Sequence, residues 1–185
     1  MDNGASSYRR FLEGDDDGIV QIIKEYKNGL MLYLNGLVQN IHIAEDLTED
    51  TFVKLIARRP QFSGKSAFKT WLYSIGRNVA LDHLRKNRKM PTMSVEETQL
   101  LSSDEADITR NYLQTERKFQ VHKAMKRLVR EYRQVLYLAY VEEFQNVQIA
   151  SVMGKSKKQI ENLLYRTKLS LKSELEKEGF VYEDL

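Results

Sequence analysis

The residues best suited to chemistry lie along one predicted helix, FKTWLYSIGRNVALDHLRKNRK (Phe68–Lys89). At 100° per residue its apolar side chains form one stripe, which is typical of a helix that packs on a core. A second face carries hydroxyl, amide and guanidinium groups and ends in the basic run RKNRK. A face that is only solvated usually mixes lysine with glutamate, so this one indicates a binding surface. The stripe is Phe68, Trp71, Leu72, Ile75 and Val79, and the second face is Thr70, Ser74, Arg77, Asn78, Leu81 and Arg85.

A second basic segment, NVQIASVMGKSKKQIENLLYRT (Asn146–Thr167), has the spacing of a helix-turn-helix. Gly154 follows the small Ala150 by four residues and can take the positive φ that ends a helix sharply. The stretch Ser156–Gln159 predicts a capping box, which would place two lysines and the glutamine in the exposed first turn that enters a DNA major groove. An ordinary helical hairpin with a lysine-rich surface is the alternative. The predicted core between the two helices is Ile149, Met153, Ile160, Leu163 and Leu164.

The charges are unevenly distributed along the chain, although their sum is only +3. RKNRK (Arg85–Lys89) holds four basic residues, and Gly154–Ser173 holds six against the single acid Glu161. Between them, Met90–Thr109 holds five acids and no basic residue. Two positive patches on either side of an acidic connector predict two nucleic-acid contacts made by two separate bodies.

The composition excludes several classes of protein. A chain of 185 residues is long enough for one or two small domains. The absence of cysteine excludes disulfides, thiolate zinc sites and cysteine nucleophiles, and fits a reducing compartment. No apolar run approaches the roughly 20 residues of a membrane span, and MDNGASSYRR lacks the apolar middle of a secretory signal. We expect a soluble, cytoplasmic protein without membrane insertion.

No catalytic, cofactor or metal site is predicted from the residues. EGDDDGIVQIIK (Glu13–Lys24) begins like a calcium loop, but its twelfth place holds lysine instead of a bidentate glutamate. Aspartates that favour a helix N-terminus are the better interpretation of this segment. The histidines are far apart in sequence, and the neighbours Asp82 and His83 would point apart on a helix. We therefore expect a binding protein that is not an enzyme.

The elements that must position these groups are all helical, because apolar residues recur at helical spacing and no segment alternates as a strand does. In the N-terminal half we expect helices from Asp17 to Ile41, from about Ile43 to Ala57, and from Phe68 to about Asn87. Residues 90–109 read as a linker. Helical periodicity returns near Asn111, followed by helices at 131–142, at 146–153 and after Ser156. The predicted fold is all-α, with two small helical domains at residues 8–89 and 110–179.

With both basic segments in view, the chain resembles the extracytoplasmic-function (group IV) branch of bacterial sigma factors, in the sigma-70 superfamily. AEDLTEDTF (Ala44–Phe52) is similar to the family's AEDLxQExF stretch. FKTWLYSIGRNVALDHLRK is similar to FxxWLxxIARNxxxDxxR, and Leu128–Gly154 resembles the fourth conserved region. The resemblance covers nearly the whole chain in family order. It implies a sigma region 2 helical bundle and a region 4 helix-turn-helix, which together direct core RNA polymerase to promoters.

The resemblance also implies a role for each surface. AEDLTEDTF would dock on the β′ clamp helices of core RNA polymerase, and region 4 would meet the β flap. The third helix would hold one strand of the melted −10 element, and the last helix would read the −35 duplex. Most of the family are controlled by an anti-sigma factor, and the sequence leaves open whether this chain has one. The implied polymerase-binding residues are Glu45, Asp46, Leu47, Glu49, Asp50 and Phe52. The implied −10 residues are Thr70, Ser74, Arg77, Asn78, Arg85, Lys86, Arg88 and Lys89, and the −35 residues are Lys155, Ser156, Lys157, Lys158, Gln159, Asn162 and Arg166.

The last helix departs from the family pattern. Glu161 and Leu163 stand where the family has a lysine and an arginine, so any borrowed −35 consensus is in doubt. Two other functions stay open: a stand-alone helix-turn-helix regulator, which would bind duplex DNA without polymerase, and a non-transcribing helical protein that binds polymerase or another partner. Neither needs a surface for an unpaired strand. We assign Trp71 to the core instead of to base stacking.

Overall fold

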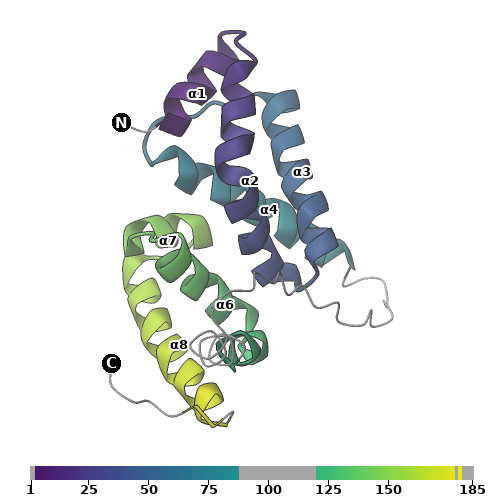
Figure 1. Ribbon diagram of the computed structural model, residues 1–185. Coiled ribbons are helices and arrows are strands. Elements are labelled where there is room, and N and C mark those ends of the chain that lie inside the picture. Colours follow the sequence, from purple (N-terminus) through teal and green to yellow (C-terminus); the bar gives the residue numbers. More distant parts are fainter. Residues whose placement is uncertain (1–2, 88–119, 178, 181–185) are drawn as a thin grey trace, which may run out of the picture.

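The computed structural model describes residues 3–87, 120–177, 179 and 180, and within these ranges every regular element is helical (Figure 1). No helix in this part of the chain is long and apolar enough to cross a membrane. Residues 88–119 lie outside the described residues, and they include the site residues Arg88 and Lys89, the predicted linker (90–109) and the first ten residues of the predicted second domain (110–119). The N-terminal helices are α1 (Asn3–Leu12), α2 (Asp17–Val38), α3 (Ile41–Arg58) and α4 (Phe68–Asn87). The C-terminal elements are helical residues 120–127, α6 (Arg130–Leu136), the π-helical turn η1 (Tyr137–Val141), α7 (Asn146–Met153) and α8 (Lys157–Lys177).

The break between α2 and α3 is earlier than the apolar pattern predicted. Gln39 has a left-handed φ of 54°, and the Asn40 side chain accepts hydrogen bonds from the amides of His42 and Ile43. Such a cap stabilises a helix start by about 1 kcal/mol. Ile41, which we expected to end the preceding helix, therefore begins α3. Helix α1 was not predicted at all.

An aromatic cluster joins α1 to the start of α4. The Trp71 ring lies 5.1 to 5.5 Å, between centroids, from the rings of Tyr8, Phe62 and Phe68. The Tyr8 hydroxyl also donates to the Pro60 carbonyl at 2.7 Å, which fixes the loop before α4. These contacts confirm the assignment of Trp71 to the core, since its ring is engaged by other aromatic side chains.

The turn between α6 and α7 departs from the single helix predicted at 131–142. The helix widens into η1 after Leu136, and Glu143 takes a positive φ of 56°. The Phe144 amide then donates to the Leu138 carbonyl at 2.8 Å, so the chain reverses sharply. Single π-helical turns of this kind commonly reposition side chains at functional sites. Here the turn directs Phe144 onto Tyr73 of α4, with ring centroids 5.4 Å apart.

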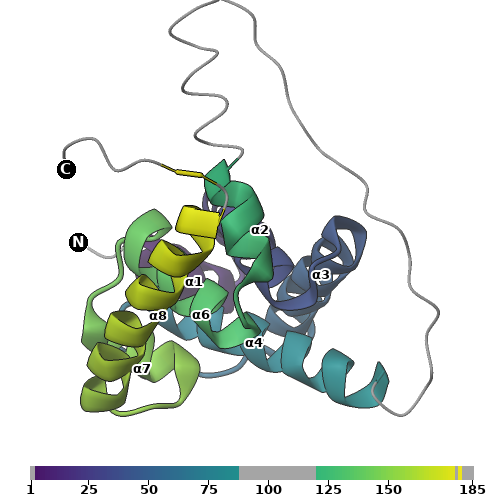
Figure 2. The ribbon, with the colours of Figure 1, turned by 90° about the horizontal axis from the view of Figure 1, so that it is seen from below.

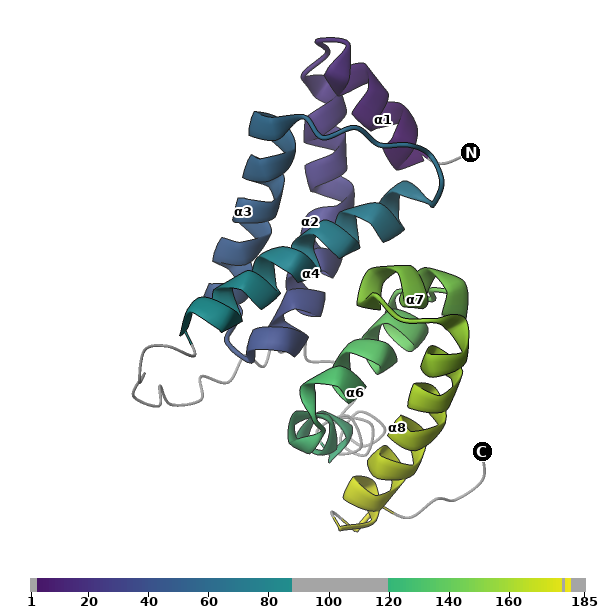
Figure 3. The same ribbon diagram turned by 180° about the vertical axis from the view of Figure 1, so that it is seen from behind.

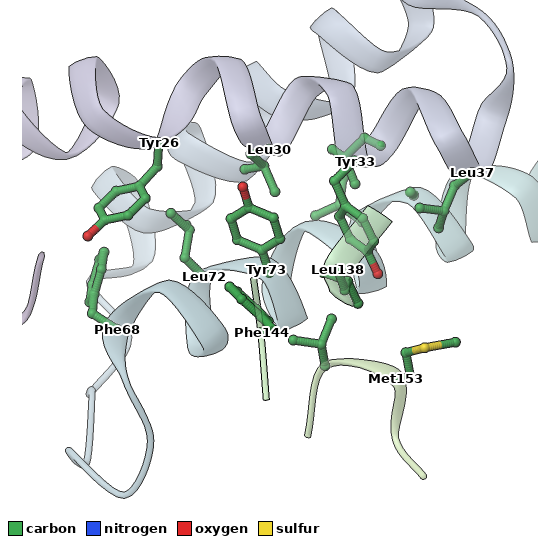
Figure 4. Packing of buried hydrophobic residues seen from close by; sticks show 14 of the residues in the cluster. Tyr26, Leu30, Tyr33, Leu37, Phe68, Leu72, Tyr73, Leu138, Phe144 and Met153 are labelled. Atoms are coloured by element: carbon green, nitrogen blue, oxygen red, sulfur yellow. The ribbon is translucent and has the colours of Figure 1, made fainter. Parts of the chain in front are cut away.

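The two predicted domains share one continuous core, whereas the sequence suggested two separate bodies. Helix α6 packs against α2, and α7 packs against α4. Figure 4 shows Leu138 of η1 near Tyr33 of α2, and Phe144 of the turn after η1 beside Tyr73 of α4. As seen from behind in Figure 3, α4 runs across α2 and α3 with the C-terminal helices beside it. Helix α4 is therefore buried on two sides, not on one.

Candidate nucleic-acid interface

Helices α7 and α8 form the predicted helix-turn-helix. Gly154 ends α7 with a left-handed φ of 65°. The Gln159 amide donates to Ser156 Oγ at 3.2 Å, and the Ser156 amide donates to Gln159 Oε1 at 2.8 Å. This reciprocal pair is the predicted capping box, and it is confirmed. The predicted core is buried as well: Ile149, Met153, Ile160 and Leu163 are at most 3 % exposed, and Leu164 packs against them.

The first turn of α8 presents exposed polar side chains. Lys157, Lys158 and Gln159 are exposed, as are Asn162, about one turn further along, and Arg166, about two turns further along. Helix N-termini also attract phosphate through their unpaired amides and dipole. The sequence-predicted −35 residues are thus brought to one exposed face, except for Lys155.

Two acids reduce the positive charge of this face. Lys155 is half-buried and its Nζ lies 2.8 Å from Glu131 Oε1, so it ties the turn between α7 and α8 to α6. The Glu161 carboxylate lies 3.8 Å from Lys157 Nζ, one turn away on α8. Exposed pairs of this kind are weak, so Lys157 can exchange its carboxylate for a phosphate at little cost.

The C-terminal half of α4 is an open basic surface. Asn78, Arg85 and Lys86 are exposed. Arg85 Nη1 lies 3.2 Å from Asp82 Oδ1, with both side chains more than half exposed. Ser74 Oγ donates to the Thr70 carbonyl at 2.9 Å, so that hydroxyl is already used within the helix.

The N-terminal half of the same polar face is covered by the C-terminal helices. Gln148 Nε2 donates to Thr70 Oγ1 at 3.3 Å, and Arg77 Nε donates to Gln134 Oε1 at 3.0 Å. Thr70 is fully buried. We expected Thr70 and Arg77 on a free surface, and that expectation is wrong for this arrangement of the domains. The helical period showed which side of α4 is polar, but the polar residues themselves gave no indication that another domain packs there.

An ion pair closes the same junction, and the sequence analysis missed both of its members. Lys69 Nζ lies 2.6 Å from Glu142 Oε2, and the Glu142 side chain is only 8 % exposed. Burial, followed by the neighbouring Glu142 carboxylate, raises the pKa of Tyr73, and the same two causes raise that of Tyr137. A second strip on α4, made of Tyr73, Gly76 and Ala80, was the available signal that this side is buried.

The exposed acids of the predicted docking motif form an acidic surface on α3, which lies on the other side of the molecule from α8 (Figures 1 and 2). Lys27 of α2 reaches two of its acids, with Nζ 4.0 Å from Glu45 Oε1 and 3.6 Å from Glu49 Oε1. Leu47 and Phe52, which we expected among the docking residues, are at most 4 % exposed and belong to the core. Their side chains hold α3 against the core, and a buried side chain does not reach a partner. The exposed acids are Glu45, Asp46, Glu49 and Asp50.

The acidic surface also carries an apolar component that the sequence analysis did not single out. Val53 and Ile56 continue along α3 and are 59 % and 42 % exposed. Large exposed apolar side chains beside charged ones are typical of a protein-binding surface with a polar rim. Within the described residues, no group of three or more histidines, cysteines or acids could hold a metal ion.

Comparison with known proteins relates these surfaces to a family. The sigma-70 region 2 family model matches residues 22–90, and the sigma-70 region 4 model matches residues 118–171. The RNA polymerase sigma-H factor of Pseudomonas aeruginosa is 30% identical over 152 residues, covering 78% of this chain and 79% of that protein. The ECF RNA polymerase sigma factor SigM of Bacillus subtilis is 27% identical over 155 residues, 84% of this chain and 93% of SigM. Sigma factor RpoE of Bartonella quintana, solved in complex with the anti-sigma factor NepR, has a similar fold, with a TM-score of 0.68 at 22% identity over 84% of this chain and 95% of that one.

Proposed function

This chain belongs to the extracytoplasmic-function branch of the sigma-70 family of RNA polymerase sigma factors, and we propose that its three surfaces divide the work of promoter-specific transcription initiation. It directs core RNA polymerase to promoter DNA, as members of this family do. Residues 8–89 are assigned to region 2, 90–109 to the linker and 110–179 to region 4. The two family-model matches support this division.

The −35 duplex is read by the first turn of α8. The observation that carries the proposal is the capped, exposed start of this helix, with Lys157, Lys158 and Gln159 on the surface. Gln159 and Asn162 have side-chain amides, which can pair with the edge of an adenine in the major groove. Lys157, Lys158 and Arg166 bind phosphates and set the register of the helix on the duplex.

The melted −10 strand is held along α4. Asn78 and Arg77 lie close to the bases, and the basic end of the helix, which includes Arg85 and Lys86, lies on phosphates. A single strand exposes the base edges that are paired in a duplex. The Asn78 amide can hydrogen-bond to such an edge while the neighbouring cations bind phosphates. Thr70 and Arg77 take part only after the C-terminal helices move away, because both are engaged by those helices here.

Core polymerase docks on α3. The exposed carboxylates of Glu45, Asp46, Glu49 and Asp50 steer the encounter with a basic partner, and Val53 adds apolar area. The β′ clamp helices are the proposed partner here and the β flap is the proposed partner of region 4. The polymerase forms the RNA bonds, and this chain contributes binding. Its place of action is the cytoplasm, where the polymerase and its template meet.

An anti-sigma factor stays a prediction. Transcription of fragmented host DNA by sigma-free core polymerase, with and without this chain, tests the function itself. We expect a discrete set of new RNA 5′ ends that share two upstream motifs. A chain that binds core polymerase yet yields no new 5′ ends would be a non-transcribing partner. A chain that binds duplex DNA but no polymerase would be the stand-alone regulator, which the match to region 2 argues against.

A further inference from the structure

The Glu142 carboxylate is enclosed at the junction of the two domains, where it pairs with Lys69, whose side chain is 35 % exposed. Besides the 2.6 Å contact with Glu142, Lys69 Nζ lies 5.2 Å from the centre of the Phe144 ring. Gly29 of α2 makes room for the carboxylate, since a Cβ at that position would lie 2.8 Å from Glu142 Oε1. A carboxylate in so enclosed a place is retained only with a close cationic partner. Lys69 is that partner.

Two further polar groups of α4 are occupied in the same way. Arg77 gives its Nε–H to the amide oxygen of Gln134, and Thr70 receives a hydrogen bond from the amide of Gln148. The C-terminal helices thus offer a carboxylate to one cation, and amide groups to a guanidinium and a hydroxyl. Phosphates and base edges offer DNA-binding residues the same kinds of group.

Lys69 lies one residue before Thr70, at the covered end of α4. Lys69, Arg77 and Arg85 follow one another at intervals of eight residues, which is about 12 Å along a helix at 1.5 Å per residue and about 80° around it at 3.6 residues per turn. The three cations therefore wind around α4, and a polyanion that contacts all of them would cross the helix obliquely. Arg85 is exposed, whereas Lys69 and Arg77 are engaged by groups of the C-terminal domain.

We propose that Lys69 is a further contact for a phosphate of the melted −10 strand, and that Glu142 occupies this contact while the two domains are packed together. The inference rests on the proposed function of α4. A carboxylate 2.6 Å from the ammonium group leaves no room for a phosphate oxygen at the same position. Closed packing and strand binding therefore exclude each other at Lys69, Thr70 and Arg77, and the strand binds only the fraction of molecules that is open.

The test is an anisotropy titration of the full-length chain with a fluorescein-labelled, mixed-sequence single strand of 20 nucleotides, at several NaCl concentrations. The Glu142→Gln variant removes the competing charge with almost no change in shape, and we expect its affinity for the strand to rise about tenfold. Adding Lys69→Gln to that variant should lower the slope of log K against log[salt] by about 0.7, the value for one lost phosphate contact on a single strand. Both variants lack the ion pair, so their difference isolates Lys69.

Two controls make each outcome decisive. Lys24→Gln, also added to Glu142→Gln, removes an exposed lysine of α2 and should leave the slope unchanged. An unchanged affinity in Glu142→Gln overturns the competition, and an unchanged slope on adding Lys69→Gln overturns the phosphate contact. Adding Arg85→Ala and Lys86→Ala distinguishes a failure of the proposed function of α4 from a failure of the proposed role of Lys69. If that change lowers the slope while Lys69→Gln does not, the function of α4 stands and only this inference falls; if neither does, both fall.

A second measurement needs no change at the junction. The chain has no cysteine, so Val20→Cys and Ser173→Cys place two dyes on exposed positions of α2 and α8. We expect energy transfer between the dyes to change when the single strand binds the otherwise unaltered chain. Strand binding without any change in transfer would show that the domains stay packed, and it would overturn the proposal.

Discussion

The basic end of α4 gives the sharpest quantitative prediction. Replacing Arg85 and Lys86 together by alanine removes two exposed cations from the proposed strand-binding surface. Arg85 pairs with Asp82 at 3.2 Å, in a largely exposed pair that contributes about 0–1 kcal/mol, so the helix should stay folded. Each lost phosphate contact lowers the salt slope by about 0.7 on a single strand. The double variant should therefore lose about 1.4 from the slope for open-complex formation, or about 25-fold in affinity per tenfold change in salt.

The assay is open-complex formation by the reconstituted holoenzyme at a promoter found by mapping RNA 5′ ends, followed by permanganate reactivity of melted thymines across a range of KCl concentrations. The matched control is Arg9→Ala with Lys24→Ala, which removes the same two residue types from exposed positions of α1 and α2. Asp82→Asn is a second control and should not lower the slope, since it frees Arg85. An unchanged slope in Arg85→Ala with Lys86→Ala, at normal polymerase binding, would refute the phosphate role.

Three further predictions test other parts of the molecule. Asp46→Arg should abolish binding to core polymerase without altering the thermal unfolding of the free chain, and wild-type affinity in a titration would remove α3 as the docking surface. Ser156→Ala should lower the free energy of unfolding by about 1 kcal/mol and weaken −35 duplex binding, because the capping box is lost; unchanged urea midpoint and duplex affinity would contradict this. Burial raises the pKa of Tyr8 from 10.0 to about 12. The unfolded chain therefore loses this proton first, so stability is complete below pH 10 and falls as the pH rises toward 12. Tyr8→Phe should make that fall shallower in urea titrations, and an identical pH profile would count against it.

The sequence predicted the parts of this structure that depend on neighbours along the chain. Gly154 and Ser156–Gln159 lie within one turn of each other, so their spacing contains the geometry of the helix-turn-helix. The apolar stripe of α4 could likewise be predicted, because its residues recur with the period of the helix itself. The start of α3 was misplaced by two residues, since Ile41 suits either helix by hydrophobicity and the amide cap of Asn40 decides the break.

What the sequence could not show depends on contacts between distant residues. Gln134 is 57 positions from Arg77, and no local period relates the two. The pairing of Glu142 with Lys69 further depends on the π-helical turn, which adds a residue to one turn and changes the direction of those that follow. The resemblance to the family placed Leu47 and Phe52 among the predicted docking residues, but both side chains are buried and belong to the core.

The most direct measurement of the central claim is photo-crosslinking from Asn78, the exposed amide on the proposed strand-binding side of α4. A photoreactive amino acid replaces it, and the holoenzyme is irradiated on a promoter before and after melting. We expect the crosslink to form in the open complex, on one strand within the −10 element, and to be lost when melting is blocked. A crosslink of equal yield on closed duplex DNA, or one that maps outside the −10 element, would contradict the claim that α4 holds the melted strand.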